Sequence, residues 1–501
     1  MAPSVSPAPP VDTPDVEVPG ELSIPRRVVL GALLAGLVAA EVVPLDRPGL
    51  GWLLAGLAGL GAVLATTRRA AWSAGRIASA VAVVLLLGAG TVRAAGWLFV
   101  LCVLVALPFA SLAVAGGGGT WGRLARGATA LPLAVPAAVT RTVHSGVGPL
   151  RRGRQLATGT IAGLILVAVF ATLFAGANPA FAQLLTDAAD ALSLTGVLLF
   201  VLAGCLTLAA AHLRTATSPA AGAPPAHRRM LARVEWVVPV ALVDLVFGVF
   251  VWSEGVVLFG GHQYVLGPDG PTFAEYARSG FWQLTLVTVL SLGIVGVIAY
   301  RVARTDRVLI RILVGTLGIL TLVVVTSALS RMSTYVQAYG YTRVRLLGFG
   351  AELSFGAIVV LLLVAGVRMR GRWLPGAVAG LVVTAVLALV AVNPDAVVAR
   401  TVIGRYQQDG HLDGKYLSGL SEDAVTALDR LPDVERSCVL NAMHLPSTVD
   451  SWSAYNAGRS AARRLARVRP PDRYEPECPY VFQSGPWNPV FQSGPGDPVG
   501  G

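Results

Sequence analysis

Charged residues are scarce in this chain. Asp, Glu, Lys and Arg make up 13% of its 501 residues, hydrophobic residues make up 54%, and Lys415 is the single lysine among the 39 basic residues. Soluble globular domains carry about 25% charged residues. The low charge, together with a mean hydropathy of +0.66, excludes the soluble classes and predicts a polytopic membrane protein.

Catalytic and metal-binding motifs are also missing. The six histidines do not have the spacing of zinc ligands, and the chain contains neither a nucleophile elbow nor a closely spaced cysteine pair. The glycine run 116–119 is not followed by the Gly-Lys-Ser/Thr that completes a phosphate-binding loop. These absences predict no catalytic residue, no metal site and no cofactor, and they favour a non-enzymatic protein.

Long apolar runs dominate what is present. About 20 apolar residues are needed to cross the roughly 30 Å of hydrocarbon in a bilayer. Residues 77–114 are too long for one crossing and Arg93 interrupts them, so we expect two spans joined by a tight turn. The stretch 128–140 is too short to cross and contains Pro132 and Pro136, so we interpret it as an interfacial or loop segment. The predicted spans are 27–44, 49–66, 77–91, 94–114, 156–177, 194–213, 236–258, 281–300, 308–329, 346–367 and 374–392.

Basic residues are concentrated in alternate connectors. Of the 28 basic residues that flank or join these spans, 22 lie in every second connector. Cytoplasmic loops carry the excess of Lys and Arg, so we expect about eleven transmembrane helices with the N-terminus inside and the C-terminus outside. The same pattern accounts for the net charge of +11, and nucleic acid is not expected as a partner. Abundant Arg, Ala, Gly and Pro are typical of a GC-rich genome and indicate a bacterial plasma membrane.

The fold class that follows is an all-α membrane protein with a small helical extracytoplasmic module. We expect a disordered cytoplasmic lead at 1–25, a helical bundle at 26–392, the module at 393–470 and a disordered Pro/Gly-rich tail at 471–501.

Three helices are expected in the module, at 393–410, at 421–431 after a Ser421 cap, and at 451–468. The last is predicted from an apolar stripe that contains Trp452 and Tyr455, with Arg459 on another face.

Of the four cysteines, one lies in this module and one lies in the Pro/Gly-rich tail that follows it. Cys102 and Cys205 fall within predicted spans, whereas Cys438 and Cys478 lie beyond the last span. An oxidising compartment would permit a disulfide between Cys438 and Cys478, and the sequence leaves open whether it forms.

Four carboxylates fall within predicted spans, where a charge costs several kcal/mol unless it is paired or faces water. Glu41, Glu254 and Glu352 lie towards the outer ends of their spans, and Asp244 lies nearest the midplane. Each is therefore a candidate site residue.

Arginines on the outer side are the exceptions to the charge alternation. They are Arg47, Arg93, Arg278, Arg331, Arg343 and Arg345, and three of them bracket a segment that holds Tyr335, Tyr339 and Tyr341. In one interpretation these arginines pair with Glu41, Glu254 and Glu352 and close the outer rim. In the other, arginines, tyrosines and carboxylates line an outward-facing pocket for an anionic or lipid-linked ligand.

Three short motifs resemble a family of bacterial membrane proteins. They are the Ala-Tyr-Gly-Tyr-Thr-Arg segment at 338–343, the Asn-Pro-Asp at 393–395, and a pattern made by Gly410, Leu412, Asp413, Tyr416, Leu417, Leu420 and Ser421. The chain resembles the proteins grouped as domain of unknown function 4153/4173 over roughly residues 150–435. The resemblance implies a polytopic protein without an established activity.

The sequence leaves three hypotheses for function. The first is a non-enzymatic plasma-membrane protein in envelope transport, sensing or assembly, with an outward-facing polar site. The second is a transferase that uses a polyprenyl-linked donor, with Arg331, Arg343 and Arg345 binding the pyrophosphate and Glu352 as base. It requires a groove open to lipid beside Arg343. The third is a secondary transporter coupled through Asp244.

Overall fold

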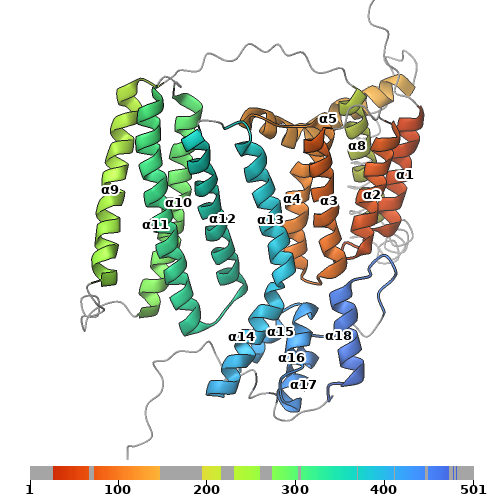
Figure 1. Ribbon diagram of the computed structural model, residues 1–501. Helices are drawn as coiled ribbons and strands as arrows, with labels where there is room; N and C mark the ends of the chain where they lie inside the picture. Colours follow the sequence, from red (N-terminus) through yellow and green to blue (C-terminus); the bar gives the residue numbers. More distant parts are fainter. Residues whose placement is uncertain are drawn as a thin grey trace, which may run out of the picture.

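A computed structural model describes residues 26–66, 73–146, 194–215, 231–259, 273–302, 306–368, 371–410, 412–445 and 449–472, together with Cys478 and Val481. The regular elements in these ranges are all helical, as the sequence predicts. Figure 1 shows long, roughly parallel helices with a set of shorter helices at one end.

One group of long helices comes from the first part of the chain. It contains α1 (Arg26–Val42), α2 (Leu50–Thr66), α3 (Ala74–Val92), α4 (Gly96–Ala115) and α8 (Leu194–Thr215). α1 packs against α2 and α8, and α3 packs against α4. Because α3 ends at Val92 and α4 begins at Gly96, the predicted division of the 77–114 stretch at Arg93 is confirmed.

A second group contains α9 (Arg233–Phe259), α10 (Phe273–Arg301), α11 (Arg307–Tyr339) and α12 (Arg343–Arg368). Buried apolar side chains hold α10 to α11, among them Phe281, Val324 and Met332. α13 (Leu374–Val392) contacts α12 on one side and α3 and α4 on the other, so it connects the two groups (Figure 1).

Eight of the described helices are long and apolar enough to cross a membrane, which indicates a multi-pass membrane protein. They are α3, α4 and α8 to α13. α1 and α2 coincide with predicted spans but have 17 residues each. The predicted span 156–177 lies outside the described residues.

The segment 128–140 is part of a helix, α5 (Trp121–Gly146), so a loop is the wrong interpretation. Figure 1 shows α5 lying across the ends of α3 and α4. The Ser111 hydroxyl of α4 donates to Gly127 O at 2.5 Å and accepts from Leu131 N at 2.9 Å. This hydroxyl inserts into the backbone hydrogen bonds of α5 just before Pro132, which explains how the helix tolerates the proline.

The shorter helices are here called the tail helices. They are α14 (Pro394–Asp409), α15 (Gly414–Ser418), η4 (Glu422–Ala424), α16 (Val425–Leu428), α17 (Asp433–Ala442) and α18 (Ala457–Val468). They share a core of buried apolar residues that includes Val398, Leu417, Leu428 and Val439. We call the end of the long helices at which the tail helices lie the tail-side end (Figure 1). The opposite end is called the basic end, because α1, α9, α11 and α12 have arginines there.

The structure confirms one of the predicted helices of the tail region and breaks another into shorter pieces. The helix at 393–410 is confirmed, and it ends at Gly410 with φ +73°. The stretch after Ser421 is a 3₁₀ turn and one short α-helix rather than a continuous helix, and the Ser421 side chain makes no cap hydrogen bond. α15 and α17 were not predicted, because each is short and lacks a clear helical period.

The helix predicted at 451–468 starts later, at Ala457. Trp452 and Tyr455 precede it with 65% and 49% of their surface exposed, whereas Arg459 is 2% exposed. The predicted apolar stripe is therefore wrong at its start. The reason is the Asn456 cap, whose side chain accepts from Arg459 N and begins the helix there.

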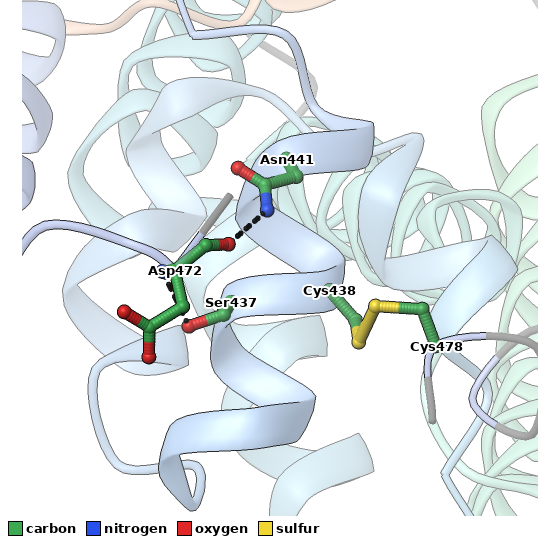
Figure 2. The surroundings of a disulfide bond; sticks show 5 residues. All are labelled: Ser437, Cys438, Asn441, Asp472 and Cys478. Atoms are coloured by element: carbon green, nitrogen blue, oxygen red, sulfur yellow. Dashed lines mark hydrogen bonds between the residues drawn. A yellow bond between two sulfur atoms is a disulfide. The ribbon is translucent and has the colours of Figure 1, made fainter. Parts of the chain in front are cut away.

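A disulfide joins Cys438 of α17 to Cys478, with the Cα atoms 5.4 Å apart. Figure 2 shows the bond beside two hydrogen bonds to Asp472. Asp472 N donates to Ser437 Oγ at 3.1 Å, and Asn441 Nδ2 donates to Asp472 O at 2.7 Å. The segment after α18 is thereby attached to α17 at two places.

Candidate functional site

The most extensive polar contacts of the described residues lie where the tail helices meet the long helices. Arg343 begins α12 and Asp395 lies in the first turn of α14. Arg343 Nε and Nη2 donate to the two carboxylate oxygens of Asp395 at 2.7 Å each. This bidentate pair is the strongest geometry for an ion pair.

Further donors complete the surroundings of Asp395. Ser421 N donates to Asp395 Oδ2 at 2.9 Å, and Arg343 N donates to the Tyr416 hydroxyl at 3.0 Å. Burial raises the pKa of Asp395, but the hydrogen bonds from Arg343 and Ser421 outweigh it and hold the pKa below its ordinary value. The ionised carboxylate is therefore the form that the fold favours.

A second carboxylate, Asp423 of η4, binds the turn between α3 and α4. Ala94 N and Ala95 N donate to Asp423 Oδ2 at 2.7 and 3.0 Å. These N–H groups precede the first turn of α4, where backbone donors lack partners within the helix. Burial raises the pKa of Asp423 above its ordinary value although both backbone hydrogen bonds oppose the shift.

Asn456 binds the other side of the same turn. Its Nδ2 donates to Gly90 O at 2.7 Å and to Arg93 O at 2.8 Å, at the end of α3. Arg93 in turn donates to Val390 O and Ala391 O at the end of α13, at 2.7 and 3.1 Å. The tail helices therefore satisfy backbone groups on both sides of one turn, and the Arg93 side chain of that turn binds the last carbonyls of α13.

The turn between α1 and α2 receives a third set of contacts. Arg459 Nη2 donates to Pro48 O at 2.6 Å, Leu50 N donates to Tyr455 O at 3.0 Å, and Gly51 N donates to Ser453 O at 2.7 Å. Arg459 is itself held by Asp450, whose Oδ2 lies 3.2 Å from Arg459 Nε.

Asp450 also accepts from Arg463 at 2.9 Å. Burial raises the pKa of Asp450, but hydrogen bonds from Arg463 and Arg459 outweigh it, and the pKa lies below its ordinary value. We call Arg343, Asp395, Asp423, Asp450, Asn456 and Arg459 the junction residues.

The other predicted outer residues also lie towards the tail-side end of the long helices. Arg331 forms an ion pair with Glu254, which also accepts from Ser327 Oγ at 3.3 Å. Arg345 donates to Tyr339 O at 2.9 Å and to Gly340 O at 2.5 Å, and its guanidinium lies 4.2 Å from the centre of the Tyr335 ring. Tyr341 packs against the core of the tail helices.

Three predicted carboxylates are not part of this group. Glu41 is exposed at the end of α1, and Asp244 has two buried oxygens without a hydrogen-bond partner among the described residues. Glu352 is buried among α10, α11 and α12 beside Thr288. It lies nine residues after Arg343, about 13 Å along the helix, so Arg343 pairs with Asp395 instead. Of the expected rim pairs, the described residues contain only the one between Arg331 and Glu254.

Most junction residues were not predicted. Asp395 lies in the Asn-Pro-Asp motif that carries the family resemblance, and this motif is the sequence signal that points to it. Asp423, Asp450 and Arg459 are surrounded by polar sequence and gave no signal, because burial of a charged side chain cannot be read from a local pattern.

The outer arginines bind groups of the protein itself. Arg331, Arg343 and Arg345 are all bound by carboxylates or carbonyls of the protein. The described residues contain no group of three or more His, Cys, Asp or Glu that could hold a metal ion. An apolar cavity of about 280 Å³ lies among α1 to α4 and α8, and none of the three arginines lines it.

A family model described as a domain of unknown function (DUF4153) matches residues 77–431. The resemblance seen in the motifs is therefore confirmed, and the match begins nearer to the N-terminus than the motifs indicated. No curated protein and no solved structure matches the chain.

Proposed function

Since the matched region covers more than half of the chain, the protein belongs to the DUF4153 family, and we propose that it is a non-enzymatic plasma-membrane protein for envelope assembly or sensing. In this proposal the tail helices form an extracytoplasmic module that is docked on the outer end of the membrane helices. The outward-facing polar residues serve this docking.

The proposed topology has eleven spans, the N-terminus in the cytoplasm and the tail helices outside. Two observations support it. α1, α9, α11 and α12 have arginines at their basic ends, and an excess of arginine is typical of cytoplasmic ends. The disulfide between Cys438 and Cys478 fits an oxidising compartment on the other side.

The observation that carries the docking function is the bidentate pair of Arg343 and Asp395, with Asp395 fully buried and also bound by Ser421 N. A ligand phosphate or carboxylate would have to displace an internal carboxylate that is already in ideal geometry. The transferase hypothesis receives less support for this reason.

Arg343→Ala tests the docking function. We expect the variant to be inserted in the membrane but to expose the tail helices to protease added to the outside of whole cells, with loss of envelope integrity. Arg464→Ala is the matched control, because Arg464 is exposed on α18. If the tail of Arg343→Ala stays as protected as that of the control, the docking function is wrong.

The topology has its own test. An alkaline phosphatase fused after Gly501 is active only in an extracytoplasmic space, so we expect activity from the full-length fusion. Cytoplasmic location of the reporter would contradict the proposed span number.

Asp244 supports a second candidate, a secondary transporter. Both of its carboxylate oxygens are buried on α9 without a hydrogen-bond partner among the described residues, as expected of a group that exchanges an ion. Asp244→Asn would then abolish ion-dependent uptake in vesicles while leaving the tail protected from protease. Unchanged uptake profiles in wild type and variant would exclude the transporter.

A further inference from the structure

One fully buried carboxyl of the long helices has no role in docking. Glu352 of α12 is 0% exposed. Its Oε1 lies 3.1 Å from Thr288 Oγ1 of α10, and its Oε2 has no hydrogen-bond partner among the described residues. The hydroxyl of Thr285, three residues earlier on α10, also faces this carboxyl.

The number of hydroxyl protons near Glu352 indicates whether its carboxyl is ionised or protonated. Thr288 Oγ1 lies 3.1 Å from Leu284 O as well as from Glu352, and a hydroxyl has one proton to donate. Thr285 Oγ1 likewise donates to a backbone carbonyl, Phe281 O, at 3.0 Å. An ionised Glu352 would need the protons of both threonines, which would then leave those carbonyls, and it would hold a charge without a basic partner inside a membrane, which is costly. A protonated Glu352 donates to Thr288 Oγ1 while Thr288 donates to Leu284 O. Only a neutral carbonyl oxygen is then without a partner.

Basic groups around Glu352 are already engaged elsewhere. Arg331 of α11 is paired with Glu254, and Arg343 at the start of α12 is paired with Asp395 of α14. α13 contains no titratable residue. The remaining basic side chains that the structure describes on α10 to α12 are Arg345, which binds carbonyls at the tail-side end, and Arg301, Arg307, Arg311 and Arg368 at the basic end.

A cavity lies between Glu352 and the basic end, and Glu352 itself does not line it. It has a volume of about 90 Å³ and lies among α10, α11 and α12, which is room for water. Exposed Arg311 lines it at one end, and buried Ser291 and Thr321 line it at the other. Ser291 and Thr321 donate to backbone carbonyls at 2.9 and 2.7 Å, so their oxygens can still accept from water. Ser291 lies one turn from Thr288.

We propose that Glu352 is a proton-binding site which exchanges with water through this cavity from the basic end. The step is the addition of one proton to a carboxylate to give the neutral acid, and it needs no other reactant. This site goes beyond docking, because it makes the α10–α12 unit responsive to the proton concentration on one side of the membrane.

Infrared difference spectroscopy of the full-length protein in lipid nanodiscs tests the site. The spectrum of wild type minus Glu352→Gln should contain the band of a protonated carboxyl at neutral pH, and this band should fall as the pH is raised. A carboxylate band from about pH 5 to pH 9 would overturn the proposal.

A second experiment covers the case in which Glu352→Gln does not fold. Wild-type Glu352 is modified with a carbodiimide, and the modification is mapped by mass spectrometry. Modification that falls with rising pH supports proton binding, and protection by sodium at constant pH overturns it in favour of a cation site.

Filling the cavity tests the route. An added Cβ at Gly315 of α11, which lines the cavity, meets no atom within 4 Å, so Gly315→Leu places its side chain in the space with little strain. After a pH jump the carboxyl band of Glu352 should change several-fold more slowly in this variant. Gly293→Leu is the control, since Gly293 is also unobstructed but does not line the cavity. Equal rates in both variants and wild type would overturn the route.

Discussion

At the scale of single residues, the junction depends on carboxylates whose surroundings differ. Asp395 and Asp450 accept hydrogen bonds from arginines, and their pKa values lie below the ordinary one. Asp423 accepts from two backbone N–H groups without a salt bridge, and burial raises its pKa. Three aspartates in similar positions are therefore expected to respond differently to substitution and to acid.

Asp395→Asn and Asp423→Asn separate these environments. Asp395→Asn leaves Arg343 without its bidentate partner, so we expect a loss of about 3 kcal/mol in the stability of the docked tail. Asp423→Asn retains an amide oxygen that accepts from Ala94 and Ala95, and should cost less than about 1 kcal/mol. Protease protection of the tail as a function of denaturant measures both. Equal losses in the two variants would contradict the difference in environment.

Acid should act on the junction in two opposite steps. The pKa of Asp423 is raised in the folded state, so its ionised form opposes docking, and protonation removes that penalty as the pH falls through the folded pKa. The pKa values of Asp395 and Asp450 are lowered, so their contributions are present above the ordinary value of about 3.9 and are lost below it as the pH falls. Protection measured against pH should therefore hold or rise at first and then collapse. Asp423→Asn should remove the first step only.

At the scale of helices, backbones approach so closely at the tail-side turns that some positions admit only glycine. Gly51 lies in the first turn of α2, where an added Cβ would overlap Val42 O at the end of α1. Gly51 N also donates to Ser453 O. This glycine therefore allows α1, α2 and the segment before α18 to meet in one place.

Gly51→Ala should destabilise the protein by about 2 kcal/mol, because the turn has to move to admit the methyl group. Gly61→Ala, in the same helix, is the control, since an added Cβ there meets nothing within 4 Å. The temperature at which the detergent-solubilised protein aggregates should fall for the first variant and stay unchanged for the second. Equal behaviour would mean that the turn adapts to the extra group without cost.

At the scale of the whole molecule, the disulfide closes a long loop that includes part of the tail helices. Cys438 and Cys478 are separated by 40 residues, and α18 lies between them. Closing a loop of this length lowers the entropy of the unfolded chain by an amount worth about 4 kcal/mol in the chain-entropy model. The tail is thus expected to depend strongly on its redox environment.

Cys438→Ser with Cys478→Ser should lower the unfolding temperature of the tail by an amount equal to that caused by reductant on wild type. In wild type, alkylation under denaturing conditions should modify only Cys102 and Cys205, which the structure shows as free thiols. Alkylation of all four cysteines without reductant would contradict the bond.

How far the sequence predicts this molecule also depends on scale. Hydropathy predicts the described membrane-length apolar helices, including the break at Arg93, because a lipid-facing helix needs a continuous apolar run. It does not predict α5, whose 26 residues include two prolines. The tail was predicted less well, since α15 and α17 are short and are held by contacts with distant residues. The junction was missed for the same reason: Asp395 and Arg343 are 52 residues apart, and Asn456 and Gly90 are 366 apart. No local pattern reports such pairs.

The contacts of Arg459 have a consequence for how the protein is made. Arg459 and Pro48, which share a hydrogen bond, are separated by 411 positions in the chain. A ribosome makes Pro48 long before Arg459 exists, so the backbone groups of the first tail-side turn must wait until the 411 following positions have been synthesised. Completion of the junction therefore follows the synthesis of the described helices from α2 to α17. A chain that stops before Arg459, or inserts one helix incorrectly, leaves the backbone groups of that turn without these partners.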